Sequence, residues 1–292
     1  MTSHWPRTPQ RDPWFPAGQG GVRTGRFELC FSRHGARTHI GRQFVSYPFH
    51  FTRPFALDHA IPSLLTVYQQ SSSGGLYRAE QLSSRYELGP NAAAHITTQA
   101  ATIVHDCHGQ PACQHSEVIM EEGAFLALTP DPLVLFPGAA CENTLTARLA
   151  PGATLLLADA FASHDPDDHA RPFDRLGSHV RIEDRSGRLL ARDCFRIDGA
   201  ALSGEASPIG GWRVVANYML LGDCAVLPSR QTLTDSLDLA DCVSGVSELP
   251  NGIGWAIRCL AANAIAARAV SERLFALSVE AAFGASPALR RK

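Results

Sequence analysis

Residues 105–115, HDCHGQPACQH, concentrate side chains that could bind a metal ion. The Gly-Gln-Pro turn predicts a β-hairpin centred on Gln110. Residues two apart in a strand share a face, so the hairpin would present four ligands on one side: His105, Cys107, Cys113 and His115. Two imidazoles and two thiolates suit Zn²⁺ or Ni²⁺. The sequence leaves four alternatives open: a weak or transient metal site, a permanent site, a disulfide between the two cysteines, and a solvated hairpin.

A second polar cluster follows at residues 162–170, ASHDPDDHA. It offers two imidazoles and three carboxylates on a Pro-containing loop: His164, Asp165, Asp167, Asp168 and His169. The set has the donors of a metal site, and it is equally typical of a solvated loop. The two clusters together would be needed for a metal-dependent hydrolase, which requires an open coordination position in one pocket.

The elements that must position these clusters are mainly β-strands. In GRFELCFSRHG, apolar Phe27, Leu29 and Phe31 alternate with polar residues, which is the period of a half-buried strand. In HVRIEDRSGRLLARDCFRID, two β-like runs flank Asp-Arg-Ser-Gly, a hairpin turn signal. Gly and Pro interrupt the chain at short intervals, and helical periodicity is absent until the C-terminus.

An internal repeat supports this fold class. Three segments align without gaps: LGPNAAAHITTQ from residue 88, MEEGAFLALTPD from residue 120 and LAPGATLLLADA from residue 149. Each has an apolar residue, a turn and an extended apolar run. A repeated strand-turn-strand unit predicts a solenoid-like stack of antiparallel hairpins and sheets that share one core.

The C-terminal segment, residues 263–283, predicts an α-helix. Asn263 is a suitable N-cap and Gly284 stands where a C-terminal glycine cap belongs. Its apolar side chains recur at helical spacing and form one stripe. The stripe either docks on the protein's own sheet or meets a partner in part, through Val270, Leu274, Phe275 and Leu277.

Composition limits the class of protein. The chain of 292 residues has a formal net charge of −2 and no long basic run, which gives no footprint for nucleic acid. No apolar run is long enough to cross a membrane. Residues 1–21, with four prolines, predict a flexible tail rather than a signal peptide, and residues 22–292 a single β domain. We therefore expect a cytoplasmic protein with reduced cysteines.

Sequence signatures of catalysis are absent. The chain has no GxGxxG after a strand, no Walker loop, no GxSxG elbow and no HExxH. No Ser/His/Asp set stands out by its spacing. The missing motifs do not by themselves make the chain inactive, but nothing in the sequence nominates a catalytic nucleophile.

Five segments, in order along the chain, together resemble one family. They are SSSGGLYRAEQL, HITTQAATIVH, LTPDPLVLFPGA, LAPGATLLLADAFASHDP and SGRLLARDCFRIDG. This ordered set, with Thr97-Thr98-Gln99 and Pro130-Asp131-Pro132, is similar to UreD (UreH), the urease accessory protein family. The resemblance runs from about Gly25 through Gly284.

The resemblance implies a mainly β, solenoid-like fold with a small helical part, and a role without catalysis. It implies a scaffold that binds UreF and, through UreF, the GTPase UreG. The assembly would dock on apo-urease and assist nickel delivery to its active site, with a polar passage through the UreD-like chain and Ni²⁺ bound only transiently. A β-solenoid binding module without a metal role is a further alternative.

The resemblance also assigns individual residues. The family's Gly-Gly-x-x-x-Gly-Asp element corresponds to Gly74, Gly75, Ala79 and Glu80, so alanine and glutamate replace the second-part glycine and the aspartate. Alanine resists a positive φ, which puts the local turn in question. The family's other acidic positions match Asp131 and Asp159. Carboxylates such as Glu80, Asp131 and Asp159 suit a hard or borderline cation held loosely by oxygen, and the alternative is ordinary capping and turn hydrogen bonding. His164-Asp165-Pro166 stands where the family has an Arg-Gly-Glu segment.

Overall fold

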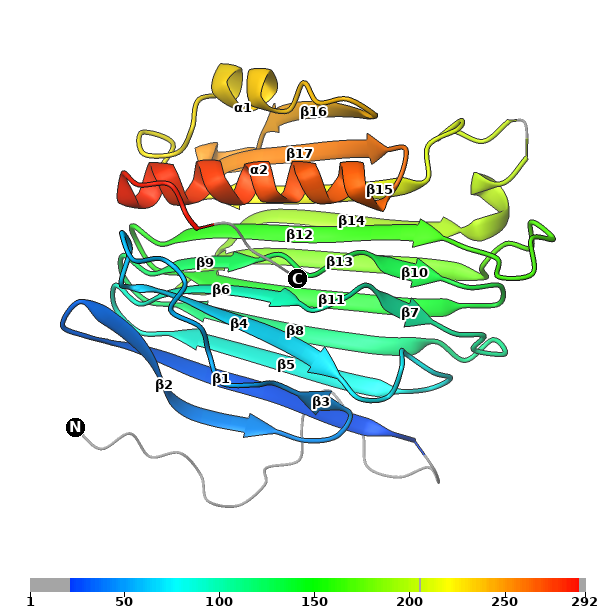
Figure 1. Ribbon diagram of the computed structural model, residues 1–292, viewed down its shortest axis with the longest axis horizontal. Helices are drawn as coiled ribbons and strands as arrows, with labels where there is room; N and C mark the ends of the chain where they lie inside the picture. Colours follow the sequence, from blue (N-terminus) through cyan, green and yellow to red (C-terminus); the bar gives the residue numbers. More distant parts are fainter. Residues whose placement is uncertain (1–21, 205, 289–292) are drawn as a thin grey trace.

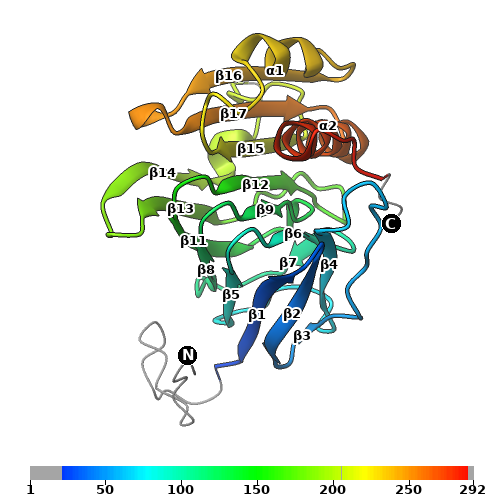
Figure 2. The ribbon, with the colours of Figure 1, turned by 90° about the vertical axis from the view of Figure 1, so that its left-hand side faces the viewer.

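The computed structural model describes residues 22–204 and 206–288 of the chain (Figure 1). The predicted flexible Pro-rich tail, residues 1–21, lies outside the described residues. Two large β-sheets face each other, and a long helix covers part of one of them (Figure 2). The prediction of a mainly β, solenoid-like fold with a C-terminal helix is confirmed.

The seven-stranded sheet has the order β14-β13-β11-β8-β5-β1-β2. Its strands are β1 (Thr24–His34), β2 (Arg37–Val45), β5 (Gln81–Leu88), β8 (Ala112–Met120), β11 (Ala140–Leu149), β13 (Arg175–Asp184) and β14 (Leu189–Asp198). The ten-stranded sheet has the order β16-β17-β15-β12-β9-β6-β4-β3, with β10 beside β12 and β7 beside β10. Its strands are β3 (Phe49–His50), β4 (Leu64–Ser71), β6 (Ala93–Thr98), β7 (Thr102–Val104), β9 (Phe125–Leu128), β10 (Leu133–Leu135), β12 (Thr154–Ser163), β15 (Val214–Leu221), β16 (Cys242–Glu248) and β17 (Gly254–Ala261).

The internal repeat is the stacking unit. In the seven-stranded sheet Leu88 pairs with Met120, and Met120 with Leu149. In the ten-stranded sheet Ala93 pairs with Phe125, and Phe125 with Thr154. These are the positions that the ungapped sequence alignment superimposes, so the alignment predicts the strand register.

The repeat is connected differently from the predicted hairpins. Each turn carries the chain from one sheet across to the other, as from β5 to β6, β8 to β9 and β11 to β12. Equivalent strands of successive units then pair in parallel. A hairpin and a crossing between sheets both need Gly, Pro or Asn at the turn, so these residues do not distinguish them. The predicted turn at Asp184–Gly187 does form an antiparallel hairpin, β13–β14.

Residues 105–115 also fail to form a hairpin. β7 and β8 flank this segment but belong to different sheets: β7 pairs with β10, and β8 pairs with β5 and β11. Between them the backbone is held by the next coil, through a hydrogen bond from Cys107 N to Gly138 O of 3.0 Å. The prediction of a hairpin centred on Gln110 is therefore wrong.

Two buried layers hold the fold together. The main core lies between the sheets and includes the inward residues Phe27, Leu126 and Leu155. A second core lies on the opposite face of the ten-stranded sheet, under α1 (Arg230–Ser236) and α2 (Ala264–Phe283). Short 3-10 turns, η1 (Gly199–Leu202) and η2 (Pro250–Gly252), complete the described elements. Among the described residues, no helix has the length and apolarity to cross a bilayer.

The C-terminal helix begins and ends as predicted. The Asn263 side chain accepts a hydrogen bond from Ala266 N, and Gly284 closes the helix in the left-handed conformation. The apolar stripe packs onto the protein's own sheet, the first of the two alternatives; contact of part of the stripe with a partner stays a prediction. Val270, Leu274 and Phe275 are buried, and Leu277 is partly buried against the same core.

Candidate functional site

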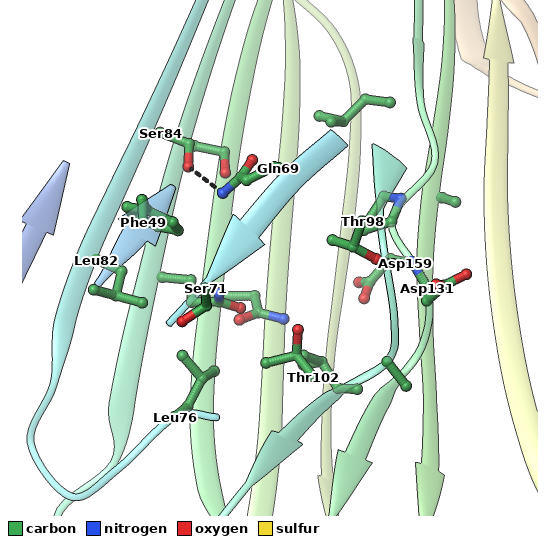
Figure 3. A pocket seen from close by; sticks show the side chains of 18 of the residues that line it. Phe49, Gln69, Ser71, Leu76, Leu82, Ser84, Thr98, Thr102, Asp131 and Asp159 are labelled. Carbon is green, nitrogen blue, oxygen red and sulfur yellow. Dashed lines mark hydrogen bonds between the residues drawn. The ribbon is translucent and has the colours of Figure 1, made fainter. Parts of the chain in front are cut away.

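A cavity of about 760 Å³ lies between the two sheets (Figure 3). Inward positions of β5, β8, β11 and β13 line one wall, and β4, β6, β7 and β12 line the other. Polar side chains occupy several inward positions where the strand period would otherwise place core residues. They include Ser84, Ser116, Asn143 and Ser178 from the seven-stranded sheet.

Two carboxylates stand on the wall formed by the ten-stranded sheet. Asp159 lies on β12, and its Oδ2 accepts a hydrogen bond from Ser178 Oγ across the gap between the sheets. Burial raises the pKa of Asp159 above its usual value, and the Ser178 hydrogen bond partly opposes that effect. Asp131 follows β9 and donates its backbone N–H to Thr98 Oγ1 at 2.8 Å. Figure 3 shows both carboxylates beside Thr98.

A small hydrogen-bond network fixes the polar groups deeper in the cavity. Tyr86 donates its hydroxyl to Gln69 Oε1. Gln69 Nε2 lies 3.4 Å from Ser84 Oγ, which joins the two sheets. Because the amide is held at both ends, it presents an ordered polar surface rather than a mobile side chain.

One rim of the cavity is built on Gly74 and Gly75. Both have a positive φ, and a Cβ on Gly75 would stand 2.5 Å from Ile103 O and 3.0 Å from the His105 ring. Glycine is therefore required at Gly75 for both its backbone conformation and its close approach to β7. His105 stacks on Tyr77 with ring centroids 4.5 Å apart.

Ala79 occupies the left-handed conformation, with φ of 58°. The turn therefore forms although alanine replaces the family's glycine. The left-handed conformation costs an L-residue such as alanine about 1–2 kcal/mol. We expect Ala79→Gly to raise the free energy of unfolding by about 0.5–1 kcal/mol, after the entropy that glycine adds to the unfolded chain. Urea denaturation measures the change in the free energy of unfolding. A lower value for Ala79→Gly would contradict the conclusion that Ala79 is strained.

Glu80 is buried beside this turn, 1% exposed. Its Oε2 accepts the Tyr77 N–H at 3.1 Å, whereas its Oε1 has no hydrogen bond and lies 3.7 Å from the Arg23 guanidinium. Burial raises the pKa of the Glu80 carboxyl. Glu80 lies next to the rim and is not among the residues that line the cavity.

The raised pKa gives a pH-dependent prediction. The folded protein binds the Glu80 proton more tightly than the unfolded chain, so ionisation costs stability as the pH rises above the unfolded pKa. We expect Glu80→Gln to raise the free energy of unfolding at pH 7.5 by about 1 kcal/mol. The gain should disappear near pH 3, well below the ordinary glutamate pKa, where the wild-type carboxyl is protonated in both states. Denaturation at both pH values tests this sign, and an equal gain at both would contradict it.

The four predicted ligands of residues 105–115 do not share one face. Cys107 is fully buried, and its thiol donates to His105 O and Ala140 O at 3.3 Å. Cys113 lies on β8 opposite Gln81 and Glu142, and burial raises the pKa of its thiol. His115 lies two residues further on β8 and contributes to the cavity wall. Both cysteines are free thiols.

The central carboxylate of the second predicted cluster forms hydrogen bonds within its own loop. Asp165 accepts the backbone N–H groups of Asp167, His169 and Arg171, and it also binds the Arg171 guanidinium. Those hydrogen bonds hold the pKa of Asp165 well below its usual range. Across residues 22–204 and 206–288, no group of three or more His, Cys, Asp or Glu side chains is arranged to hold a metal ion.

His164 lies apart from that loop's hydrogen bonds and continues a row of rings along the coil edge. Its ring centroid is 5.7 Å from that of Phe136, which is in turn 5.7 Å from that of His105. The row brings His164 and His105 onto the same edge of the stack, separated by a phenylalanine.

The cavity offers scattered oxygen donors rather than a closed ligand set. Hydroxyl, amide and carboxylate oxygens are suited to a hard or borderline cation that exchanges ligands readily. The carboxylates Asp131 and Asp159 supply the negative charge that such a cation requires. The sequence pattern missed Gln69, Ser84 and Ser178; polar residues at inward positions of otherwise apolar strands are the signal that would have found them.

Comparisons with known proteins give the same family over most of the chain. The family model of the UreD urease accessory protein matches residues 23–292. A urease accessory protein UreD from Methylorubrum populi is 42% identical over 266 residues, which cover 90% of each chain. One from Bradyrhizobium sp. strain BTAi1 is 38% identical over 282 residues, 97% of this chain and 100% of that protein. The chain belongs to the UreD family of urease accessory proteins.

Proposed function

We propose that this protein is a non-catalytic scaffold for urease maturation in the cytoplasm. In this proposal it binds UreF and, through UreF, the GTPase UreG. The assembly docks on apo-urease and assists delivery of nickel to the urease active site. The family assignment supports the urease role, and the cavity between the sheets is the observation that supports a part in handling the metal.

Nickel is the cargo in this proposal, not a resident cofactor. A passing ion has to be bound weakly enough to leave, so it needs donors in succession rather than one closed site. Asp131 and Asp159 stand on the same wall; Ser178 donates its hydroxyl to the Asp159 carboxylate, and Thr98 Oγ1 accepts the backbone N–H of Asp131. These oxygens could replace part of the hydration shell of Ni²⁺ without enclosing it.

The metal-dependent hydrolase is a weaker alternative. It needs the two His-rich segments in one pocket. Asp165 is instead occupied by Arg171, and Cys107 is bonded inside the core. A binding module without a metal role differs from the main proposal in one respect: it predicts that the carboxylates of the cavity are irrelevant to nickel.

The proposal is tested in cells that lack this protein but contain urease, UreF and UreG. Urease purified from them should hold little nickel, and returning the gene should restore both nickel content and activity. A pull-down of the tagged protein should recover UreF, and should recover UreG only when UreF is present. Normal nickel content without the protein would refute the proposal.

A further inference from the structure

The outer face of the seven-stranded sheet is covered by a ladder of ion pairs. Guanidinium and carboxylate groups alternate from strand to strand along this ladder, and each charge in it has an opposite neighbour. The ladder runs from β2 to β13 through Arg42–Glu87, Arg85–Glu117, Arg148–Glu117 and Arg148–Glu183. Such pairing leaves this part of the face nearly neutral.

The ladder stops at the edge strand β14. Arg192 and Arg196 are exposed there, and no ion pair is formed by either among the described residues. Arg192 also stands directly opposite Arg181 of β13, a second positive charge. Asp193, the acidic residue between them, belongs to the other face of the sheet, where it binds Arg258 of β17 at 2.6 Å. Asp198 is also exposed on this face, two residues beyond Arg196, so the two arginines outnumber one carboxylate and the outer face of β14 keeps a net positive charge.

The free side of β14 is a strand edge. β14 pairs with β13 alone. Beyond that ladder, the turns η1 and η2 contact β14, and Asn251 Nδ2 of η2 donates a hydrogen bond to Leu190 O, near the first residue of the strand. An edge of this length leaves N–H and C=O groups available to a further strand.

The ten-stranded sheet extends past this edge. Arg258 of β17 reaches β14, and β16 is the next strand beyond β17. Val243 and Gly245 of β16 pair with Leu260 and Arg258, on the face turned toward the seven-stranded sheet. Val243 is 57% exposed, and a Cβ built on Gly245 would meet no atom within 4 Å. The inner face of β16 is thus uncovered.

We call the β14 edge together with the inner face of β16 the β14 ledge; Figure 2 shows β14 at the side of the stack, with β17 and β16 above it. β13 faces β12 through the Ser178–Asp159 hydrogen bond, and Phe195 of β14 lies against Phe161 of β12. Because neighbouring strands lie about 4.8 Å apart, a strand added to β14 would lie over β17, beside β16. Its inward side chains would reach toward Val243, and it would extend the seven-stranded sheet over part of the ten-stranded sheet that β14 leaves open.

We propose that the β14 ledge binds an extended, acidic segment of a partner protein, which adds to β14 as an eighth strand. Backbone hydrogen bonds to β14 supply affinity, and carboxylates on the outer face of the added strand pair with Arg192 and Arg196. Apolar residues on its inner face reach toward Val243. The ion-pair ladder then continues by one more strand.

Charge argues against the chain's own ends as occupants. Residues 1–21 carry two arginines and one aspartate, and residues 289–292 are LRRK. Neither end of this chain has the acidic character that the ledge requires. For two copies of the chain pairing antiparallel through β14, charge gives no decision: centred on Cys194, Arg192 of one copy stands opposite Arg196 of the other, which is repulsive, whereas centred on Phe195 it stands opposite Asp198, which is attractive. The experiment therefore has to distinguish a second copy from a partner segment.

The experiment uses the full chain and a fluorescent nine-residue peptide that alternates glutamate and valine. A lysine/valine peptide of the same length is its control. We expect the acidic peptide to bind with a rise in fluorescence anisotropy, and to slow hydrogen exchange of amides in residues 190–198. The basic peptide should do neither.

Matched variants locate the site. Arg192→Glu/Arg196→Glu should weaken binding of the acidic peptide by at least about tenfold, since two attractions become repulsions. Arg230→Glu/Arg273→Glu, an equal charge change at exposed helical positions, should leave it unchanged. Val243→Asp should weaken it about threefold or more, whereas Val226→Asp, at a site of similar exposure, should not.

Four outcomes overturn the proposal. They are equal binding of both peptides, protection from exchange outside β14, equal losses in the control variants, and protection of β14 without peptide that grows with protein concentration. The last would assign the ledge to a second copy of the chain. None of these measurements involves urease, so the result is independent of the proposed role in nickel delivery.

Discussion

Replacing Asp131 and Asp159 together by asparagine should lower the nickel content of urease matured with this protein by about tenfold or more. Both carboxylates line the cavity, and asparagine keeps their shape while it removes their charge. A unit charge within 4 Å of an ion contributes about 4 kcal/mol at an effective dielectric constant of 20, so a loss of 1.4 kcal/mol, or tenfold, is a modest expectation. Metal analysis of the purified urease measures the effect.

The matched control is Asp174→Asn/Asp198→Asn, which removes two carboxylates at exposed positions outside the cavity. It should leave the nickel content unchanged. Pull-down with UreF should be equal for both double variants, because neither pair holds a core element together. Full nickel loading with Asp131→Asn/Asp159→Asn would leave the family assignment intact and would refute the passage of nickel through this cavity.

The repeat is the part of the fold that the sequence determines most directly. The apolar residues at positions 88, 120 and 149 stack because turns of equal length place them at the same point of each coil. Sequence similarity thus predicts which residues pair. It does not predict whether the turn reverses the chain within one sheet or carries it to another, because that depends on which strand is free to accept the next one.

The segment 105–115 shows where local pattern misleads. Its His and Cys residues alternate as a hairpin face requires. The strand pairing that would bring them together is taken instead by β10 on one side and by β5 and β11 on the other. Local spacing describes a face only when the partner strand is known, and here the partners are distant in sequence.

The sequence predicts only some of the residues of the candidate site. Asp131 and Asp159 came from the family resemblance, whereas Gln69, Ser84 and Ser178 had no motif to mark them. What unites these residues is that they point between the sheets, and that property appears only when strands from four coils are stacked. A polar residue at an inward strand position is a usable signal, but it identifies a cavity only after the opposite wall has been placed.

Substitution of a buried residue of α2 should have a large effect on stability. Leu274→Ala should lower the free energy of unfolding by about 2–5 kcal/mol. Leu274 is completely buried between α2 and the ten-stranded sheet. Its neighbour Phe275 stacks on His95 of β6 with ring centroids 4.1 Å apart, which holds the helix close and limits collapse around a cavity. Urea denaturation followed by circular dichroism measures the loss.

The exposed neighbour Arg273 provides the control, since Arg273→Ala should change stability by no more than about 0.5 kcal/mol. The comparison separates the two roles that the apolar stripe could have had. Substitution of a core residue lowers the free energy of unfolding of the isolated protein, whereas substitution of a partner-binding residue weakens only the complex. Unchanged stability of Leu274→Ala together with lost recovery of UreF would restore the partner interpretation; a large loss of stability in the protein alone assigns the stripe to the protein's own core.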